Sequence, residues 1–332
     1  MSKKTFWFGF GAILIWSTTF SLSKFVLEVT EDLNFNVFIY LSLRLMFGLP
    51  YLWGALIITK RLPNVKKVLK AEWKSLLFLG LVSFAGAYIV QYFGVLGTSS
   101  INQSIILQFQ TFFVFFISAL IYKNKINPFI YVGAIVAFVG LFFIITNTPG
   151  SAPFAINLDS LGGDLMSLAT AALWATFSAG SANIVKKYDR LTILTLVETI
   201  GTIVIVPFSF INLGPGFTND LTVLDWKDWL SLAWLGIICI GVGYQLWYEA
   251  LGDSSSQDTI LLMYIMPIFS YFFGWIILQE PVDFWKTFIG TLLIIGGLII
   301  AQFIHPKKWR KIRQKKEEPN DIVQLDSDIP KP

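Results

Sequence analysis

The sequence predicts an all-α integral membrane protein with ten transmembrane helices. These helices form two inverted five-helix repeats, with both termini in the cytoplasm. Three observations carry this prediction. Charged residues are scarce, several long stretches contain none, and the two halves of the chain are similar in sequence.

Composition excludes a soluble enzyme. The 332 residues are 55% hydrophobic and only 14% charged, with a mean hydropathy of +0.66. Soluble domains are about 25% charged, because their surfaces need these groups. The single cysteine, Cys239, and the single histidine, His305, exclude disulfide frameworks, multi-cysteine metal sites and Ser–His hydrolases. We therefore expect no enzyme activity, no cofactor, no metal and no nucleic-acid partner.

Stretches without charge define the membrane spans. Five of them hold no Asp, Glu, Lys or Arg: 75–122, 126–158, 230–248, 259–279 and 287–306. A helix that crosses the bilayer needs about 20 mostly apolar residues, and turn-forming clusters such as 97–100 divide the longer stretches. The predicted spans are 6–27, 35–58, 75–96, 101–122, 128–147, 161–184, 191–212, 229–251, 257–278 and 284–305.

Lys and Arg residues predict the orientation. With the N-terminus inside, most of the 25 basic residues fall on cytoplasmic flanks, as the positive-inside rule requires. The opposite side receives Lys227 and Lys286, together with several Asp and Glu residues. Ten spans then leave both termini in the cytoplasm.

The predicted spans give four segments. These are a first repeat (1–147), an extracytoplasmic linker (148–160), a second repeat (161–305) and a disordered cytoplasmic tail (306–332). The tail changes from basic to acidic and holds little apolar material, which is typical of disorder. The first apolar run has full span length and no cleavage site, so we expect no cleavable signal peptide. We expect a multi-pass protein of the cell (cytoplasmic) membrane, with the lipid bilayer as a partner.

An internal repeat relates the two halves. Trp16 matches Trp174, and Tyr88 matches Tyr244 at an offset of 156 residues. Because each half has an odd number of spans, the second copy enters the membrane from the opposite side. Inverted repeats of this kind build alternating access around a midplane site. Carriers need such a site, and channels or receptors rarely do.

Several motifs resemble those of EamA domains. They are Trp-Ser-Thr-Thr-Phe at 16–20, Leu-Gly at 235–236, Tyr-Gln-Leu-Trp-Tyr-Glu-Ala-Leu at 244–251, Tyr-Ile-Met-Pro-Ile at 264–268 and Gln-Glu-Pro at 279–281. The chain resembles a ten-helix member of the drug/metabolite transporter superfamily, with EamA domains over about 6–147 and 161–304. The first half diverges, because Lys-Asn-Lys at 123–125 replaces the Gly-Glu-Arg-like end of the family.

The resemblance implies a secondary active transporter for small organic metabolites, with a central cavity lined by spans 1, 3, 4, 6, 8 and 9. Our first hypothesis is efflux of an amino acid or a related amphiphilic solute. Import of an organic cation or another nutrient is an alternative, and an intramembrane receptor or scaffold is the alternative outside the carriers. Coupling to protons or to a counter-substrate stays open, as does a homodimer.

Aromatic residues near the middle of the spans are cavity candidates. Trp16 and Trp174 occupy equivalent places in the first span of each half, with hydroxyls such as that of Thr19 beside Trp16. A Trp face attracts an apolar or cationic group. The alternative is that both side chains only pack or contact lipid.

Polar residues of spans 3, 4, 8 and 9 complete the predicted cavity: Tyr88, Gln91, Gln103, Gln110, Tyr244 and Tyr264. Tyr88 and Gln91 share one face of span 3, and Gln103 and Gln110 form a stripe along span 4. Amides and phenols are costly against hydrocarbon, so we expect them to point inward. Purely structural bonds between helices are the alternative.

Ionisable groups inside the membrane are functional candidates by default. Arg44 is a candidate either for clamping a carboxylate or for pairing with a helix C-terminus or a neighbouring acid. Glu198 is the candidate for proton coupling, because a buried carboxylate favours its neutral form. Glu249 lies nearer the inner surface, where a salt bridge to Lys186 or Lys187 is the alternative role.

Three further residues have predicted structural roles. Lys24 is expected to extend its ammonium towards the outer surface, and Glu280 is expected to cap a helix. Pro267 lies inside span 9, where it removes a backbone hydrogen bond and should kink the helix. In a carrier, such a kink is a candidate gate.

Overall fold

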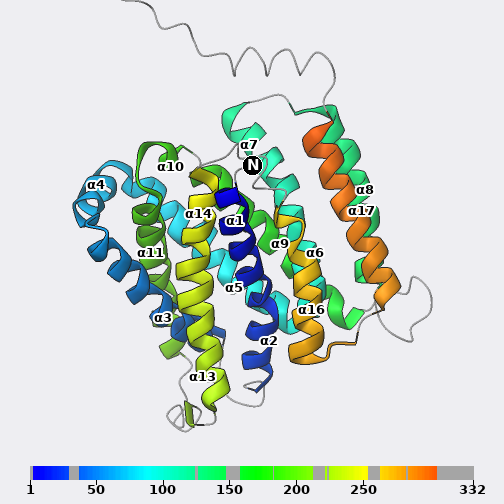
Figure 1. The fold of residues 1–332 in the computed structure, drawn as a ribbon, viewed down its shortest axis with the longest axis horizontal. Helices are drawn as coiled ribbons and strands as arrows, with labels where there is room; N and C mark the ends of the chain where they lie inside the picture. Colours follow the sequence, from blue (N-terminus) through cyan, green and yellow to red (C-terminus); the bar gives the residue numbers. More distant parts are fainter. Residues whose placement is uncertain are drawn as a thin grey trace, which may run out of the picture.

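The structure of the chain is a computed structural model. It describes residues 3–29, 37–123, 126–146, 158–181, 183–211, 221–222, 224–252, 262–281 and 283–304. The predicted tail and most of the predicted linker lie outside the described residues. Within those residues all regular structure is helical, and Figure 1 shows the helices packed side by side in one bundle.

The helices of the described residues have the following bounds: α1 (Lys3–Ser17), α2 (Thr19–Val29), α3 (Val37–Ile58), α4 (Leu62–Phe78), η1 (Leu79–Ala85), α5 (Gly86–Gly97), α6 (Ser100–Ile106), η2 (Leu107–Phe109), α7 (Gln110–Tyr122), α8 (Pro128–Ile145), α9 (Leu158–Ser181), α10 (Ile184–Lys187), α11 (Arg190–Ile211), α13 (Trp226–Ala233), η3 (Trp234–Val242), α14 (Gly243–Gly252), α16 (Met266–Leu278) and α17 (Phe284–Phe303).

Length and hydropathy identify a multi-pass membrane protein. Nine helical stretches of the described residues are long and apolar enough to cross a membrane, and α16 is a shorter apolar helix. Large apolar side chains stay exposed on these helices, including Leu120 (80%), Ile135 (67%) and Trp7 (64%). Soluble surfaces rarely present so much apolar area, whereas contact with lipid accounts for it.

The third predicted span begins close to a kink in a longer helical stretch. The third span was expected to begin at residue 75, where charged residues stop. The structure has a helical stretch over Leu62–Gly97 through α4, η1 and α5, but Glu72 has non-helical backbone angles (φ −126°, ψ 21°), so α4 is kinked three residues before position 75. The basic residues of α4 are compatible with helix, because Lys is a good helix former. Absence of charge locates the apolar part of a helix and says little about where the helix starts.

The first span is divided. Thr18 lies between α1 and α2, and its Oγ1 donates to the carbonyl oxygen of Ile15 at 2.7 Å. The Oγ of Ser17 donates to the carbonyl oxygen of Ile13 at the same distance. Hydroxyls that bond back to the preceding turn compete with the regular helical pattern and bend helices. The hydroxyls of the Trp-Ser-Thr-Thr motif thus mark a break in the span.

At the kink predicted inside span 9, the structure has a break in the helix. α16 begins at Met266, so Pro267 lies in its first turn, where a missing N–H removes no helical bond. Tyr264 and Ile265 form a turn before it. The span is therefore interrupted at the proline, and the described part of it is not one helix bent in the middle.

The sequence repeat reappears as matching irregularities. A π-helical segment stands at the same place in each half, η1 in the first and η3 in the second. Lys123 ends α7 and Gln279 ends α16, both in the left-handed conformation with φ of 51° and 53°. These residues are 156 positions apart, the offset of Tyr88 and Tyr244. Because π-helical segments and left-handed non-glycine residues are uncommon, their repetition at equivalent positions supports a common origin of the halves.

Pairs of helices from opposite halves hold the bundle together. α8 packs along α17 at one edge, and α3 lies beside α11 near the other (Figure 1), while α5 packs on α9 and α1 on α14. Glycines permit the closest approach: a Cβ on Gly133 would collide with the carbonyl oxygen of Gly297, and a Cβ on Gly140 would lie 2.6 Å from that of Gly290. Small residues at such crossings are typical of membrane helix pairs.

Candidate functional site

Each half places a Trp against the opposite half. The Nε1 of Trp16, on α1, donates to the carbonyl oxygen of Cys239 at 2.9 Å, and its ring meets that of Tyr244 edge-on, with centroids 5.0 Å apart. Trp174, on α9, meets Tyr88 edge-on at 5.3 Å. The sequence repeat maps one Trp–Tyr pair onto the other. Four predicted cavity residues therefore form two reciprocal contacts between the halves.

A chain of amides continues from Trp174. Its Nε1 donates to the side-chain Oε1 of Gln91 at 3.1 Å, and the backbone carbonyl oxygen of Gln91 accepts from Nε2 of Gln103 at 2.7 Å. Gln91 and Gln103 are buried, and Oε1 of Gln103 has no hydrogen-bond partner. An unpaired buried acceptor is costly, so this amide is poised to receive a proton donor from a bound molecule.

Arg44, on α3, lies between two tyrosines of α5. Its guanidinium carbon is 5.1 Å from the ring centroid of Tyr88 and 5.9 Å from that of Tyr92. Nη1 donates to the hydroxyl of Tyr92, whereas the buried Nε has no partner. The sequence offered a helix C-terminus or an acid as the partner of Arg44. The structure instead gives it two phenol rings, an arrangement typical of cation–π contacts.

Glu198, on α11, faces the crossing of α3 and η3. It is 0% exposed, and neither carboxylate oxygen has a hydrogen-bond partner. Its Oε1 lies 3.0 Å from the position that a Cβ on Gly48 would occupy, one turn after Arg44. Arg44 and Tyr88 are within electrostatic range of this carboxylate. The buried acid thus belongs to the same region as the tyrosines.

Two other predicted residues border this region. Nε2 of Gln110 donates to Oγ of Ser178 at 3.3 Å, which joins α7 to α9. Thr19 is buried at the start of α2, and its Oγ1 has no hydrogen-bond partner. We use the name central cluster for the buried or half-buried group made by Trp16, Thr19, Arg44, Tyr88, Gln91, Tyr92, Gln103, Gln110, Trp174, Glu198 and Tyr244.

Three predicted residues lie elsewhere. The hydroxyl of Tyr264 donates to Oε1 of Gln302 at 2.6 Å, in a separate apolar core around α8 and α17. Glu249 is exposed near the end of α14, and Lys187 pairs with Glu72 at 3.5 Å rather than with Glu249. Pro267 begins α16. Of the two partners suggested for Glu249, Lys187 thus has another acid beside it, and a salt bridge to Lys186 stays a prediction.

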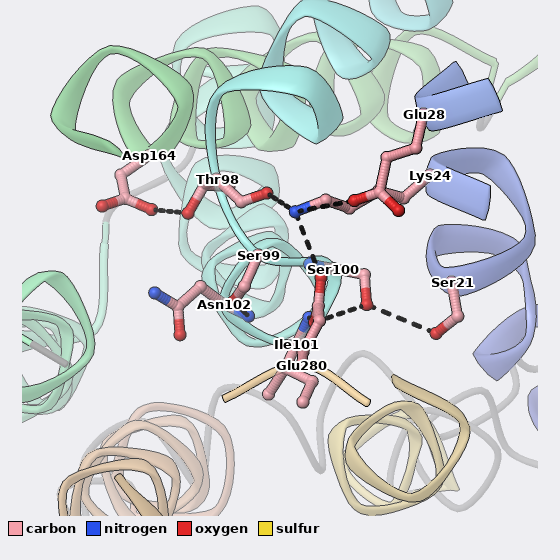
Figure 2. A network of polar contacts seen from close by, with 10 residues as sticks. All are labelled: Ser21, Lys24, Glu28, Thr98, Ser99, Ser100, Ile101, Asn102, Asp164 and Glu280. Carbon is pink, nitrogen blue, oxygen red and sulfur yellow. Dashed lines mark hydrogen bonds and ion pairs between the residues drawn. The ribbon is translucent and has the colours of Figure 1, made fainter. Parts of the chain in front are cut away.

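A polar network surrounds Lys24 on α2, and the sequence pattern indicated only part of it. Lys24 lies 3.2 Å from Oε1 of Glu280 rather than extending free towards the surface. Glu280 does cap a helix, but the helix is α6 in the opposite half (Figure 2). Asp164 accepts from Oγ1 of Thr98 at 2.6 Å. It is an acid inside a predicted span, a signal that could have been noticed.

A hollow borders this network. It has a volume of about 230 Å³ and is lined by Lys24, Leu96, Gly97, Thr98, Ser99, Asp159 and Ser160. None of the residues that line this hollow belongs to the central cluster. No group of three or more His, Cys, Asp or Glu among the described residues could hold a metal ion.

The central cluster has the chemistry of a solute site. Aromatic faces come from both halves, the amides and the cation Arg44 from the first half, and the acid Glu198 from the second. Such a mixture suits a molecule with charged and apolar parts. It lacks a nucleophile–base pair of the kind that hydrolysis needs.

Comparison with known proteins settles the family. The sequence profile of the EamA-like transporter family matches residues 3–146 and again residues 161–302. The chain belongs to the EamA-like transporter family. Its two matched regions make it a two-repeat EamA protein, in agreement with the resemblance found in the sequence.

Individual EamA relatives are transporters of unknown or partly known substrate. An uncharacterized transporter of Archaeoglobus fulgidus is 27% identical over 289 residues, which cover 87% of this chain and 94% of the relative. A probable amino-acid metabolite efflux pump of Escherichia coli is 26% identical over 212 residues, covering 63% of this chain and 68% of the pump. A solved structure, 18% identical, superposes with a TM-score of 0.60 over 94% of this chain and 99% of its own length. This last likeness concerns the fold alone.

Proposed function

We propose that this EamA protein is a secondary active transporter that exports an amino acid or a related amphiphilic metabolite across the cell membrane. The solute binds in the central cluster, and the two halves rock around it in alternating access. The reciprocal Trp16–Tyr244 and Trp174–Tyr88 contacts carry the proposal. They bring residues of both halves together, which supports one site shared by the halves of an inverted-repeat carrier.

The proposed topology has ten spans, with 257–278 as the ninth and both termini in the cytoplasm. The repeats comprise 1–147 and 161–305, joined by an outer linker at 148–160 and followed by the tail at 306–332. Figure 1 is compatible with this arrangement, because the start of α1 and α10, which follows α9, lie towards the same edge of the bundle. The first helix of each half would then run in opposite directions.

Two observations support the proposed substrate class: the side chains of the central cluster and the name of one relative. Tyrosine and tryptophan faces accommodate an apolar or cationic part, while Arg44 offers a charge to a carboxylate. The unpartnered Nε of Arg44 and Oε1 of Gln103 are free to bond a solute. The name of the Escherichia coli relative, an amino-acid metabolite efflux pump, points to the same class and to export.

Glu198 and Arg44 supply a coupling mechanism. A carboxylate without hydrogen-bond partners is costly to keep charged in a buried site, so protonation of Glu198 is favoured there. We propose that Glu198 alternates between a proton and its attraction to Arg44 as solute binds and leaves. Protons are then the exchanged species, and no bound cofactor is needed.

Thermal stabilisation of purified protein by a metabolite panel tests the proposal. A solute that binds the native state at a hundred times its Kd adds about 2.7 kcal/mol of stability. The stabilisation should disappear in Trp174→Ala and in Gln110→Ala. An exposed substitution, Glu249→Gln, serves as the control that keeps it. A solute whose effect survives both substitutions would place its site outside the central cluster and overturn the proposal.

A further inference from the structure

Two acids of the second half, Glu280 and Asp164, hydrogen-bond to residues 98–101 at the link between α5 and α6 in the first half. We call this set of contacts the grip. Oε1 of Glu280 accepts from the backbone N of Ser100 at 2.8 Å, and its Oε2 accepts from the Oγ of Ser100 at 2.9 Å and from the backbone N of Ile101 at 3.3 Å. From the other side, Asp164 accepts from Oγ1 of Thr98 at 2.6 Å. Figure 2 shows the link held between the two carboxylates.

Lys24 completes this grip from α2. Its Nζ lies 3.2 Å from Oε1 of Glu280 and donates to the carbonyl oxygen of Thr98 at 2.9 Å. The Lys24 and Glu280 side chains are only 17% and 7% exposed. Glu28, by contrast, is half exposed and lies 4.0 Å from Lys24. Removing one partner of a buried pair leaves an uncompensated charge, so the grip holds as a unit.

The network lies between the hollow and a buried part of the bundle. The hollow touches it at Lys24 and Thr98. On its inner side Ser21 and Ser100, both 0% exposed, approach each other with their hydroxyl oxygens 3.3 Å apart. Movement of solute between the hollow and the interior would have to pass these contacts.

The sequence of the first half has no acid at the position equivalent to Glu280. The register that aligns Lys123 with Gln279 places Asn124 at the position of Glu280. An asparagine has no carboxylate with which to hold a lysine. The acid at this position is therefore specific to the second half of the sequence.

We propose that Lys24, Glu280 and Asp164 form a latch that closes one end of the path between the halves, and that the latch opens in each transport cycle. This inference rests on the proposed carrier function, since a protein without alternating access needs no gate. Opening separates the second half from the Thr98–Ile101 link and exposes Ser21 and Ser100.

Cysteine accessibility tests the latch without any solute. In the full chain with Cys239→Ser, a reporter Ser21→Cys should react slowly with a water-soluble maleimide. Adding Glu280→Gln should raise the labelling rate about tenfold or more, because the latch then spends more time open. Lys24→Met, which leaves the bonds from Glu280 to Ser100 in place, should give a smaller increase and serves if Glu280→Gln does not fold.

Glu28→Gln is the matched control, because it removes the outer partner of the same lysine. The proposal is supported if labelling rises with Glu280→Gln or Lys24→Met and stays at the starting rate with Glu28→Gln. It is overturned if folded latch variants label at the starting rate, or if Glu28→Gln raises the rate equally. Solute flux is a separate measurement, so a failed search for substrate would count against the carrier and leave the labelling result to judge the latch.

Discussion

Trp174 donates its indole N–H to Oε1 of Gln91 across 3.1 Å, joining α9 of the second half to α5 of the first. Gln91 in turn accepts, through its carbonyl oxygen, from Gln103 on α6. Gln103 is thus held by the backbone of its own half, whereas the opposite half positions the side-chain amide of Gln91. Relative movement of the halves would change what this amide presents to a solute.

Trp174→Phe should destabilise the protein, because it keeps an aromatic ring but removes the N–H. Gln91 Oε1 would be left buried without its donor, at a cost of about 1–3 kcal/mol. Unfolding of the purified protein in detergent, followed by intrinsic fluorescence or by thermal aggregation, measures this cost. Gln91→Leu in the same background removes the orphaned acceptor and should recover part of the loss. Equal losses that simply add would show that the two side chains are not coupled.

Gly297→Val should weaken the pairing of α8 with α17. A Cβ at Gly297 would collide with the carbonyl oxygen of Gly133 and lie 3.0 Å from Cβ of Ala137. Overpacking of this kind costs about 1–3 kcal/mol. The neighbouring Gly296 is the matched control, since nothing lies within 4 Å of a Cβ built there. Melting temperatures of the two Val variants should differ clearly, and equal values would refute the observed packing.

Glu198→Gln should uncouple transport from the proton gradient. The amide cannot release a proton, so accumulation driven by a pH gradient should be lost while exchange of solute for solute continues. Arg44 and Tyr88 are the titratable groups in electrostatic range of Glu198, and Arg44 stays charged throughout. Flux in proteoliposomes with and without a pH gradient measures the effect. Glu249→Gln should behave as wild type, and unchanged coupling in Glu198→Gln would exclude this acid.

Asp225 should make the stability of the α13 end pH-dependent. Hydrogen bonds from the backbone N–H groups of Asp228 and Lys227 hold the pKa of Asp225 below its ordinary value. A lowered pKa in the folded state adds stability above the unfolded pKa of about 3.9, and this stability is lost as pH falls through the folded value. Asp225→Ala should therefore lower the melting temperature at pH 7, with the gap closing towards pH 3. Lys227→Ala keeps both N–H groups and removes only the weaker attraction of the Lys227 charge, so it should lower the melting temperature at pH 7 much less.

The sequence predicted the architecture because its signals are strong and local. Long apolar stretches and the 156-residue offset between Tyr88 and Tyr244 needed no knowledge of packing. The ends of helices were harder to predict. α4 begins at Leu62, among basic residues that lie outside the predicted membrane spans. A kink is predicted at Pro267 because the sequence alone does not show where the helix begins. A proline in the first turn starts a helix, whereas a proline further along bends one.

The central cluster was foreseen in part. The aromatic and amide residues were selected because polar groups avoid hydrocarbon, and the structure gathers most of them between the halves. Tyr264 meets the same criterion, but its hydroxyl bonds to Gln302. A single sequence does not distinguish a polar residue that bonds to a neighbouring helix from one that lines a cavity. The partners of Lys24 and Glu280 are separated by up to 256 positions along the chain. Pairing at such range has no periodic signature in a single sequence.

Efflux from proteoliposomes tests the central claim most directly. Vesicles containing the full chain would be loaded with labelled amino acids and related metabolites, beside empty vesicles and vesicles with a folded Trp16→Ala, Trp174→Ala double variant. The account predicts saturable efflux of at least one solute above the empty-vesicle rate, reduced about tenfold or more in the double variant. Efflux of that solute at the wild-type rate by the double variant would contradict a transport site between the two halves.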